Sequence, residues 1–189
     1  MKTLKFYALF FVMSLFAMTS CQGPQGEPGR PGKDGNANVQ SGTVTVTDDD
    51  WVWDGNACNW YLDLEWKAID YDMVDYGAVL VYMENPGKDF YAWHQLPLTL
   101  YPSDQYSATL ETVYYDYALT IYWTNSDLKQ HQNPCDFYNS DMEFKVVLID
   151  AVLFSKYHNE DLTNYETVKK LFNITAEEKI FQNSVEASK

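Results

Sequence analysis

Residue types that carry catalysis are present in the sequence, but their spacing matches no reaction centre. The three histidines, His94, His131 and His158, lie far apart in different segments. The sequence has no G-x-S-x-G nucleophile turn, no H-E-x-x-H or C-x-x-C pattern and no glycine-rich phosphate loop. We therefore expect a protein that is not an enzyme and needs no cofactor, with structural or surface histidines.

An acidic segment, Asp70-Tyr71-Asp72-Met73-Val74-Asp75, offers the carboxylate oxygens that calcium prefers. It lacks the glycine and the glutamate at position 12 that an EF-hand loop requires. We interpret this segment as a polar connection between strands, and the run Asp48–Asp50 in the same way. No metal site is expected.

The aromatic content, 16% of the residues, is the feature with the clearest functional consequence. Tyr61 and Tyr122 fall on the polar side of two predicted strands, and Trp93 falls on a third. Exposed aromatic rings can stack on sugars or anchor a protein partner, although a sandwich also uses aromatic residues in its packing. Tyr61, Trp93 and Tyr122 are therefore the candidate ligand-stacking residues, for a glycan or a protein.

The first 20 residues have the pattern of a secretory signal peptide. Lys2 and Lys5 precede an apolar segment, Phe6–Met18, that is shorter than the roughly 20 residues needed to span a bilayer. The tetrapeptide Met18-Thr19-Ser20-Cys21 is similar to a bacterial lipobox, although Met18 stands where leucine is usual. Ordinary signal cleavage is the alternative and fits the flanking residues poorly. Lipid attachment at Cys21 would anchor the mature chain stably, since two or more acyl chains suffice.

Two further cysteines, Cys58 and Cys135, remain once Cys21 is lipidated. An even pair in an oxidising compartment favours a disulfide, which would close a long loop. The alternative is two buried free thiols. Their spacing matches no zinc pattern.

A collagen-type repeat follows Cys21, within a segment assigned to residues 21–38. Glycine occupies every third position from Gly23 to Gly35, a pattern that the triple helix requires because only glycine fits at its axis. Fifteen residues of this kind extend about 45 Å at most. The segment is either a stalk that makes the protein a homotrimer or a single-chain polyproline-type spacer in a monomer. We favour the spacer.

The net charge excludes several partners. The whole chain carries 13 basic and 27 acidic residues, a net charge of −14. Residues 1–20 contain two lysines and no acids, so the remaining chain has 11 basic and 27 acidic residues, a net of −16. Such a protein repels nucleic acid and anionic membrane surfaces.

From Val39 onward, apolar residues alternate with polar ones, as in half-buried strands. The predicted strands lie around residues 43–47, 60–67, 77–83, 90–95, 106–113, 117–124 and 142–148. Turn signals such as Asn85-Pro86-Gly87 and Asn133-Pro134 separate them. We predict an all-β fold over residues 39–155, an Ig-like antiparallel β-sandwich of about seven strands.

Residues 156–189 are predicted as a helical extension. Thr163-Asn164-Tyr165-Glu166 fits a capping box, and apolar residues then follow at helical spacing up to Phe172. Thr175-Ala176-Glu177-Glu178 fits the same box and predicts a second short helix. These helices are expected to cover an open end or edge of the sandwich.

Several segments together resemble a known family. They are "SCQGPQGEPGRPGKDGNAN", "GAVLVYM" followed by "WHQLPLTLY", "MEFKVVLIDA" and "NYETVKKLFNI". They are similar to Bacteroidetes-type lipoproteins with a short collagen-like repeat, a family of unassigned activity. The resemblance implies outer-membrane attachment through lipid, on the periplasmic or the cell-surface side. The leading hypothesis is a non-enzymatic envelope lipoprotein that binds something or acts structurally. The alternative is a glycan-binding accessory module of a saccharide-uptake system.

Overall fold

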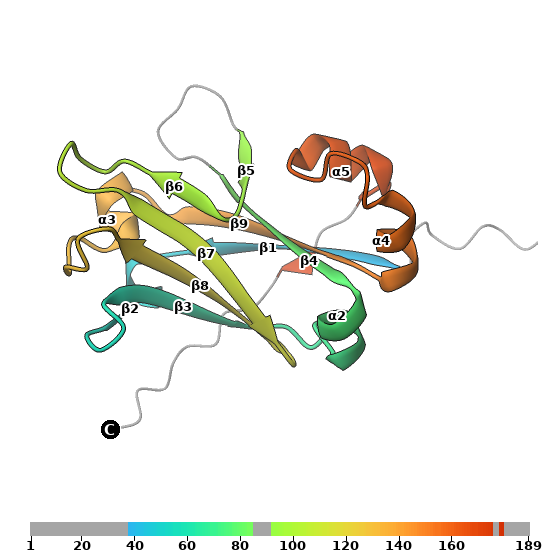
Figure 1. The fold of residues 1–189 in the computed structure, drawn as a ribbon, viewed down its shortest axis with the longest axis horizontal. Helices are drawn as coiled ribbons and strands as arrows, with labels where there is room; N and C mark the ends of the chain where they lie inside the picture. Colours follow the sequence, from blue (N-terminus) through green and yellow to red (C-terminus); the bar gives the residue numbers. More distant parts are fainter. Residues whose placement is uncertain (1–37, 85–91, 176–177, 180–189) are drawn as a thin grey trace, which may run out of the picture. The chain divides into compact units, whose positions relative to one another are not determined.

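The computed structural model describes residues 38–84, 92–175 and 178–179, which all belong to one compact unit, Lys33–Lys189. Two sheets pack face to face in this unit, as Figure 1 shows. This confirms the prediction of a mostly β protein built from two antiparallel sheets. The predicted signal peptide, Cys21 and the Gly-X-Y spacer lie outside the described residues.

Each sheet has five strands in the described part of the chain. The first sheet has the order β10 (Glu178–Lys179), β1 (Val39–Val46), β9 (Met142–Ile149), β4 (Ala78–Glu84) and β5 (Trp93–Gln95). The second has the order β2 (Val52–Asp54), β3 (Asn59–Glu65), β8 (Ala118–Asn125), β7 (Ala108–Tyr115) and β6 (Leu98–Leu100). All neighbouring strands are antiparallel except β10, which pairs parallel with β1.

The main core lies between the two sheets. The alternation predicted for 142–148 is confirmed, because Phe144 and Val146 are buried there. Leu62 of β3 and Ile121 of β8 approach from the second sheet and are also buried. Burial of such aliphatic and aromatic side chains stabilises the fold by about 1.5–3 kcal/mol each.

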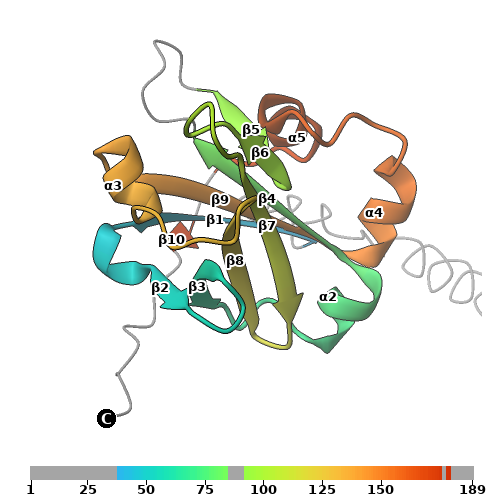
Figure 2. The ribbon, with the colours of Figure 1, turned by 60° about the vertical axis from the view of Figure 1, so that its left-hand side comes forward.

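Short helices connect and flank the strands. They are the 3₁₀ helix η2 (Asp48–Asp50) and the α-helices α2 (Tyr71–Tyr76), α3 (Pro134–Tyr138), α4 (Ala151–Tyr157) and α5 (Tyr165–Leu171). Each α-helix begins after a residue whose side chain accepts a hydrogen bond from the first turn, namely Asp70, Asn133, Asp150 and Asn164. In Figures 1 and 2, α3 and α2 lie at opposite ends of the sandwich.

A second core covers the outer face of the first sheet. Val147 and Ile149 of β9 point away from the main core and are buried against Val168 and Phe172 of the α5 segment. Both faces of the second half of β9 are therefore apolar, which explains its run of Val146, Val147, Leu148 and Ile149. In Figure 2, α5 lies beside β5 and away from β2 and β3.

Two details of the predicted fold were wrong. In the immunoglobulin order the first, second, fourth and fifth strands share a sheet, whereas here β1 lies beside β9 and β4, so the connectivity is not Ig-like. The second C-terminal helix is replaced by β10, whose residues Glu178 and Lys179 pair with the edge of β1. An edge strand offers free backbone groups, which here override the local capping pattern.

Helix boundaries also differ from the prediction. The residue that caps α5 is Asn164, one residue after the expected Thr163, and its side chain accepts from the Thr167 amide. Helix α4 crosses the boundary predicted at residue 155. No helix in the described ranges is long and apolar enough to cross a membrane.

Candidate functional site

The outer face of the second sheet is the surface on which the candidate residues gather. Cross-strand pairing places Tyr61 of β3 opposite Tyr122 of β8, and Asp63 opposite Thr120. We call this surface the open face and define it by the outward side chains of β3, β7 and β8. These are Tyr61, Asp63, Glu111, Val113, Tyr115, Thr120 and Tyr122.

Alternation along each strand explains why these side chains point outward. Leu62 and Leu64 of β3 are buried in the core, so Tyr61 and Asp63 between them face the other way. The same parity places Glu111, Val113 and Tyr115 of β7 outward, and all three are exposed. Neither α4 nor α5 contributes to this side, because both pack on the first sheet.

A shallow hollow of about 510 Å³ lies over the part of the open face next to the β2–β3 turn. Its lining residues are Trp53, Asp54, Gly55, Asn56, Tyr61, Asp63, Tyr115, Thr120 and Tyr122. The β2–β3 turn forms one rim, and Asp54 Oδ1 holds it by accepting from the amides of Asn56 (2.7 Å) and Ala57 (3.2 Å). The rim is therefore a fixed turn.

A hydrogen bond lies at the centre of the open face. The Thr120 hydroxyl, on a residue that is 3% exposed, donates to Asp63 Oδ1 at 2.6 Å. This bond fixes the carboxylate of Asp63 between β3 and β8. Asp63 therefore presents a second oxygen with a defined position to any ligand on this face.

A second hollow of about 670 Å³ continues toward the β7–β8 hairpin. Its lining residues are Asp63, Leu64, Glu65, Lys67, Tyr115, Asp116, Tyr117 and Ala118. Tyr117 adopts a left-handed backbone conformation (φ 63°), which is unusual for a bulky residue. Two backbone hydrogen bonds hold it there, from Tyr117 N to Ile69 O (2.6 Å) and from Trp66 N to Tyr117 O (2.9 Å).

Trp93 does not join the two tyrosines. It lies on β5 of the first sheet, where its ring packs against Tyr165 (centroids 5.8 Å apart). The Lys145 ammonium also lies over the Trp93 ring, 4.6 Å from its centroid. The structure thus brings Tyr61 and Tyr122 together and assigns Trp93 to the packing of the covered sheet.

The same geometry adds Tyr115 and Tyr117, each at least half exposed, to the candidate site. Their signal in the sequence is the run Tyr114-Tyr115-Asp116-Tyr117, in which the two strands turn around Asp116 and Tyr117. Hairpin register decides which tyrosine of such a run points outward, and this register is not evident from the sequence.

The predicted disulfide between Cys58 and Cys135 is not formed, and this prediction is corrected. Cys58 lies in the half-exposed β2–β3 turn, where its thiol donates to Gly55 O at 3.7 Å. Cys135 is buried at the start of α3, and its thiol donates to Val46 O at 3.4 Å. Burial raises the pKa of Cys135 to about 11, so it stays a neutral thiol.

The histidines have separate local partners. His131 contacts both carboxylate oxygens of Asp127 (3.0 and 3.1 Å) and stacks on Tyr106, with ring centroids 4.0 Å apart. His158 Nδ1 contacts the Ser155 carbonyl at 2.7 Å. His94 lies on β5, half-buried. None of these arrangements pairs a histidine with a nucleophile.

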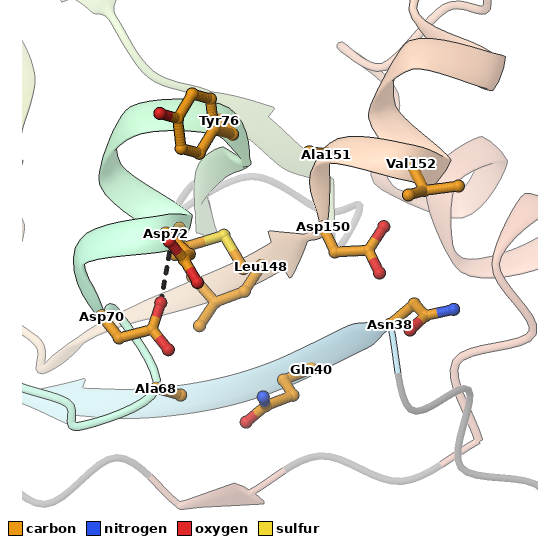
Figure 3. A pocket seen from close by; sticks show the side chains of 11 residues that line it. Asn38, Gln40, Ala68, Asp70, Asp72, Tyr76, Leu148, Asp150, Ala151 and Val152 are labelled. Carbon is orange, nitrogen blue, oxygen red and sulfur yellow. Dashed lines mark hydrogen bonds between the residues drawn. The ribbon is translucent and has the colours of Figure 1, made fainter.

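A further hollow of about 480 Å³ lies between α2, the start of α4 and the first residues of β1 (Figure 3). Asp70, Asp72 and Asp150 line it, as Figure 3 shows. Asp70 and Asp150 are already engaged as helix caps, at 2.9 Å from the amides of Met73 and Leu153. Across the described ranges, no group of three or more potential metal-ligating side chains has the geometry to hold an ion.

No family model, curated protein or solved structure matches the chain.

Proposed function

We propose that the protein is a non-enzymatic lipoprotein of the bacterial outer membrane that presents its β-sandwich on a short spacer. The position of Cys21 directly after the apolar segment carries this proposal, because that is where lipid is attached to a lipoprotein precursor. The Gly-X-Y repeat ends at Ala37 and β1 begins at Val39, so the repeat leads almost directly into the folded unit. The sandwich would be held by its first strand, on the periplasmic or the cell-surface side.

Lipid labelling tests the anchor. In cells fed a radiolabelled fatty acid, the wild-type chain should incorporate label and partition into the detergent phase. Cys21→Ser should abolish both, whereas the matched variant Cys58→Ser should keep both, since Cys58 lies within the folded unit. A wild-type chain that is cleaved but unlabelled would overturn the anchor.

The spacer also leaves two oligomeric states to distinguish. A triple-helical stalk would make the anchored protein a homotrimer, and a polyproline-type spacer would leave it a monomer. We favour the monomer because five triplets are few, and a triple helix this short would need further contacts between the chains to hold it together. Sedimentation of the detergent-solubilised chain with and without residues 22–37 separates these states: a trimer that becomes a monomer on deletion would contradict the spacer.

A second candidate function is that of a glycan-binding accessory module in saccharide uptake. The observation that favours it is the juxtaposition of Tyr61 and Tyr122 on a face that no helix of the described chain covers. Aromatic rings beside a hydrogen-bonding carboxylate such as that of Asp63 are suited to sugar rings, which have apolar faces and hydroxyl edges. A glycan panel probed with the wild-type chain and with Tyr122→Ala tests this: binding that the variant retains in full would contradict the site.

A further inference from the structure

The two hollows of the open face adjoin each other, because Asp63 and Tyr115 line both. We call the two hollows together the groove. The groove begins at the β2–β3 turn beside Asn56 and ends at the hairpin beside Tyr117. It follows β3, whose seven residues span about 20 Å at 3.3 Å per residue. This length exceeds a single sugar ring and suits a chain of several.

Tyrosines stand at both ends of the groove. Tyr61 and Tyr122 line the first hollow, Tyr117 lines the second, and Tyr115 lines both. Between Tyr61 and Tyr117, the Asp63 carboxylate is held by the nearly buried Thr120 hydroxyl and offers its other oxygen at a fixed position. The arrangement therefore provides an aromatic subsite in each hollow, with Asp63 and Tyr115 bordering both.

The charge of the groove limits the ligand. Its lining carries the carboxylates Asp54, Asp63, Glu65 and Asp116, and Lys67 is the one basic side chain in that lining. Uronic acids and sulfated sugars would bring further negative charge against these carboxylates. Neutral sugars bring hydroxyl donors, which carboxylates accept.

We propose that this groove binds a linear, neutral oligosaccharide lying along β3, with one sugar on Tyr61 and Tyr122 and another on Tyr117. The inference rests on the glycan-binding candidate function and adds its ligand class and its second subsite. Affinity should therefore rise with chain length until both hollows are occupied.

Calorimetric titration of the full chain in detergent micelles tests the proposal. The probes are neutral linear tetrasaccharides of β-linked glucose, mannose, xylose and galactose, the corresponding disaccharides, tetragalacturonate and tetralysine. At least one neutral tetrasaccharide should bind about tenfold or more tightly than its disaccharide, and tetragalacturonate should not bind.

Variants at the two ends distinguish the subsites. Tyr61→Ala and Tyr117→Ala should each weaken the tetrasaccharide about tenfold, the order expected for one aromatic contact. Tyr101→Ala is the matched control, because Tyr101 is 80% exposed and lies outside the groove lining. It should leave the affinity unchanged. Circular dichroism of each variant verifies that the fold is kept.

The possible results distinguish failure of the proposed ligand class or second subsite from failure of glycan binding itself. If a tetrasaccharide binds and only Tyr61→Ala weakens it, glycan binding stands and the second subsite is overturned. If tetragalacturonate binds more tightly than every neutral chain, the ligand class is overturned. If no saccharide binds, the glycan-binding function itself fails, and binding of tetralysine would then assign the face to a basic protein partner.

Discussion

The outer faces of the two sheets differ in what covers them. On the first sheet, α4 and α5 bury Tyr82, Val147 and Ile149 beneath a second apolar core. On the second sheet, Tyr115 is half exposed and Tyr61 and Tyr122 are half-buried, although all lie on regular strands. Aromatic residues on a covered face are explained by packing, whereas those on an uncovered face need another explanation. This difference is why Trp93 loses its place as a ligand residue and Tyr61 keeps it.

The largest effect should come from removing an anchor of the covered face. Phe172 is 2% exposed and packs edge-on against Tyr157, with ring centroids 5.5 Å apart. Phe172→Ala should lower the free energy of unfolding by about 3–5 kcal/mol in urea titrations. Tyr115→Ala on the open face should lower it by less than about 0.5 kcal/mol. Equal losses would break the distinction between the two faces.

Two glycines provide the next contrast. A Cβ on Gly77 would lie 2.9 Å from the Met73 carbonyl and 3.0 Å from the Ile149 carbonyl, both of them backbone atoms. Gly77→Ala should therefore cost about 1–3 kcal/mol, as overpacking does. Gly55, at the rim of the groove, has only Trp53 Nε1 at 3.7 Å. Gly55→Ala should leave the urea midpoint nearly unchanged. A loss as large as that of Gly77→Ala would contradict the presence of open space beside Gly55.

A smaller and pH-dependent effect is expected at Tyr82. Its hydroxyl donates to the Leu162 carbonyl at 2.6 Å, and burial raises its pKa well above the ordinary value of 10.0. The unfolded chain then loses this proton before the folded one does, so the contribution of Tyr82 to stability is full below pH 10 and falls as the pH rises further. Tyr82→Phe should cost about 1 kcal/mol at pH 7 and should flatten this alkaline decline. If the stability of Tyr82→Phe fell with pH as steeply as that of the wild type, another group would have to cause the alkaline decline.

Cys135 and Tyr138, which pack at the main core, also make the protein less stable at alkaline pH. Burial raises their pKa values to about 11 and about 12, from 9.0 and 10.0. The alkaline decline of the wild-type protein should therefore begin near pH 9 and steepen above pH 10. Urea midpoints measured at intervals between pH 7 and pH 11 check this course.

The smallest stability effect belongs to the open face itself. Tyr61 and Tyr122 are direct cross-strand neighbours, a relation that contributes about 0.2–1 kcal/mol. A double-mutant cycle of Tyr61→Ala and Tyr122→Ala should give a coupling energy in that range. A much larger coupling would mean that the pair serves the fold and would weaken its assignment to a ligand.

Much of this architecture follows from the sequence, since alternation alone identifies the inward side chains of β3, β8 and β9. Leu62, Ile121 and Phe144, apolar residues within three of the predicted strands, are buried. Strand order depends on long-range pairing that no local pattern reveals, and this explains why the Ig-like connectivity was wrong. The segment at Glu178 was predicted as a helix for a similar reason. Its pairing with the edge of β1 is a long-range contact that outweighs the helical propensity of the segment.

The candidate site was predictable only in part, for a similar reason. The parity of β3 and β8 identifies Tyr61 and Tyr122 as outward-facing, and the structure brings them together. Trp93 also falls on a predicted strand, but α5 covers its sheet and Tyr165 packs on its ring. Whether an outward residue is exposed depends on which helix packs where, and that is a property of the whole fold.

One measurement tests most directly whether the open face is the ligand surface. Backbone amide chemical shifts of the ¹⁵N-labelled chain would be followed during titration with the neutral tetrasaccharide panel. The largest shifts should fall on β3, β7 and β8, around Asp63 and Tyr115, and those of Trp93 and the residues of α5 should remain unchanged. Shifts concentrated at Trp93 and α5, or none at any tetrasaccharide concentration, would contradict the assignment of the open face as the ligand surface.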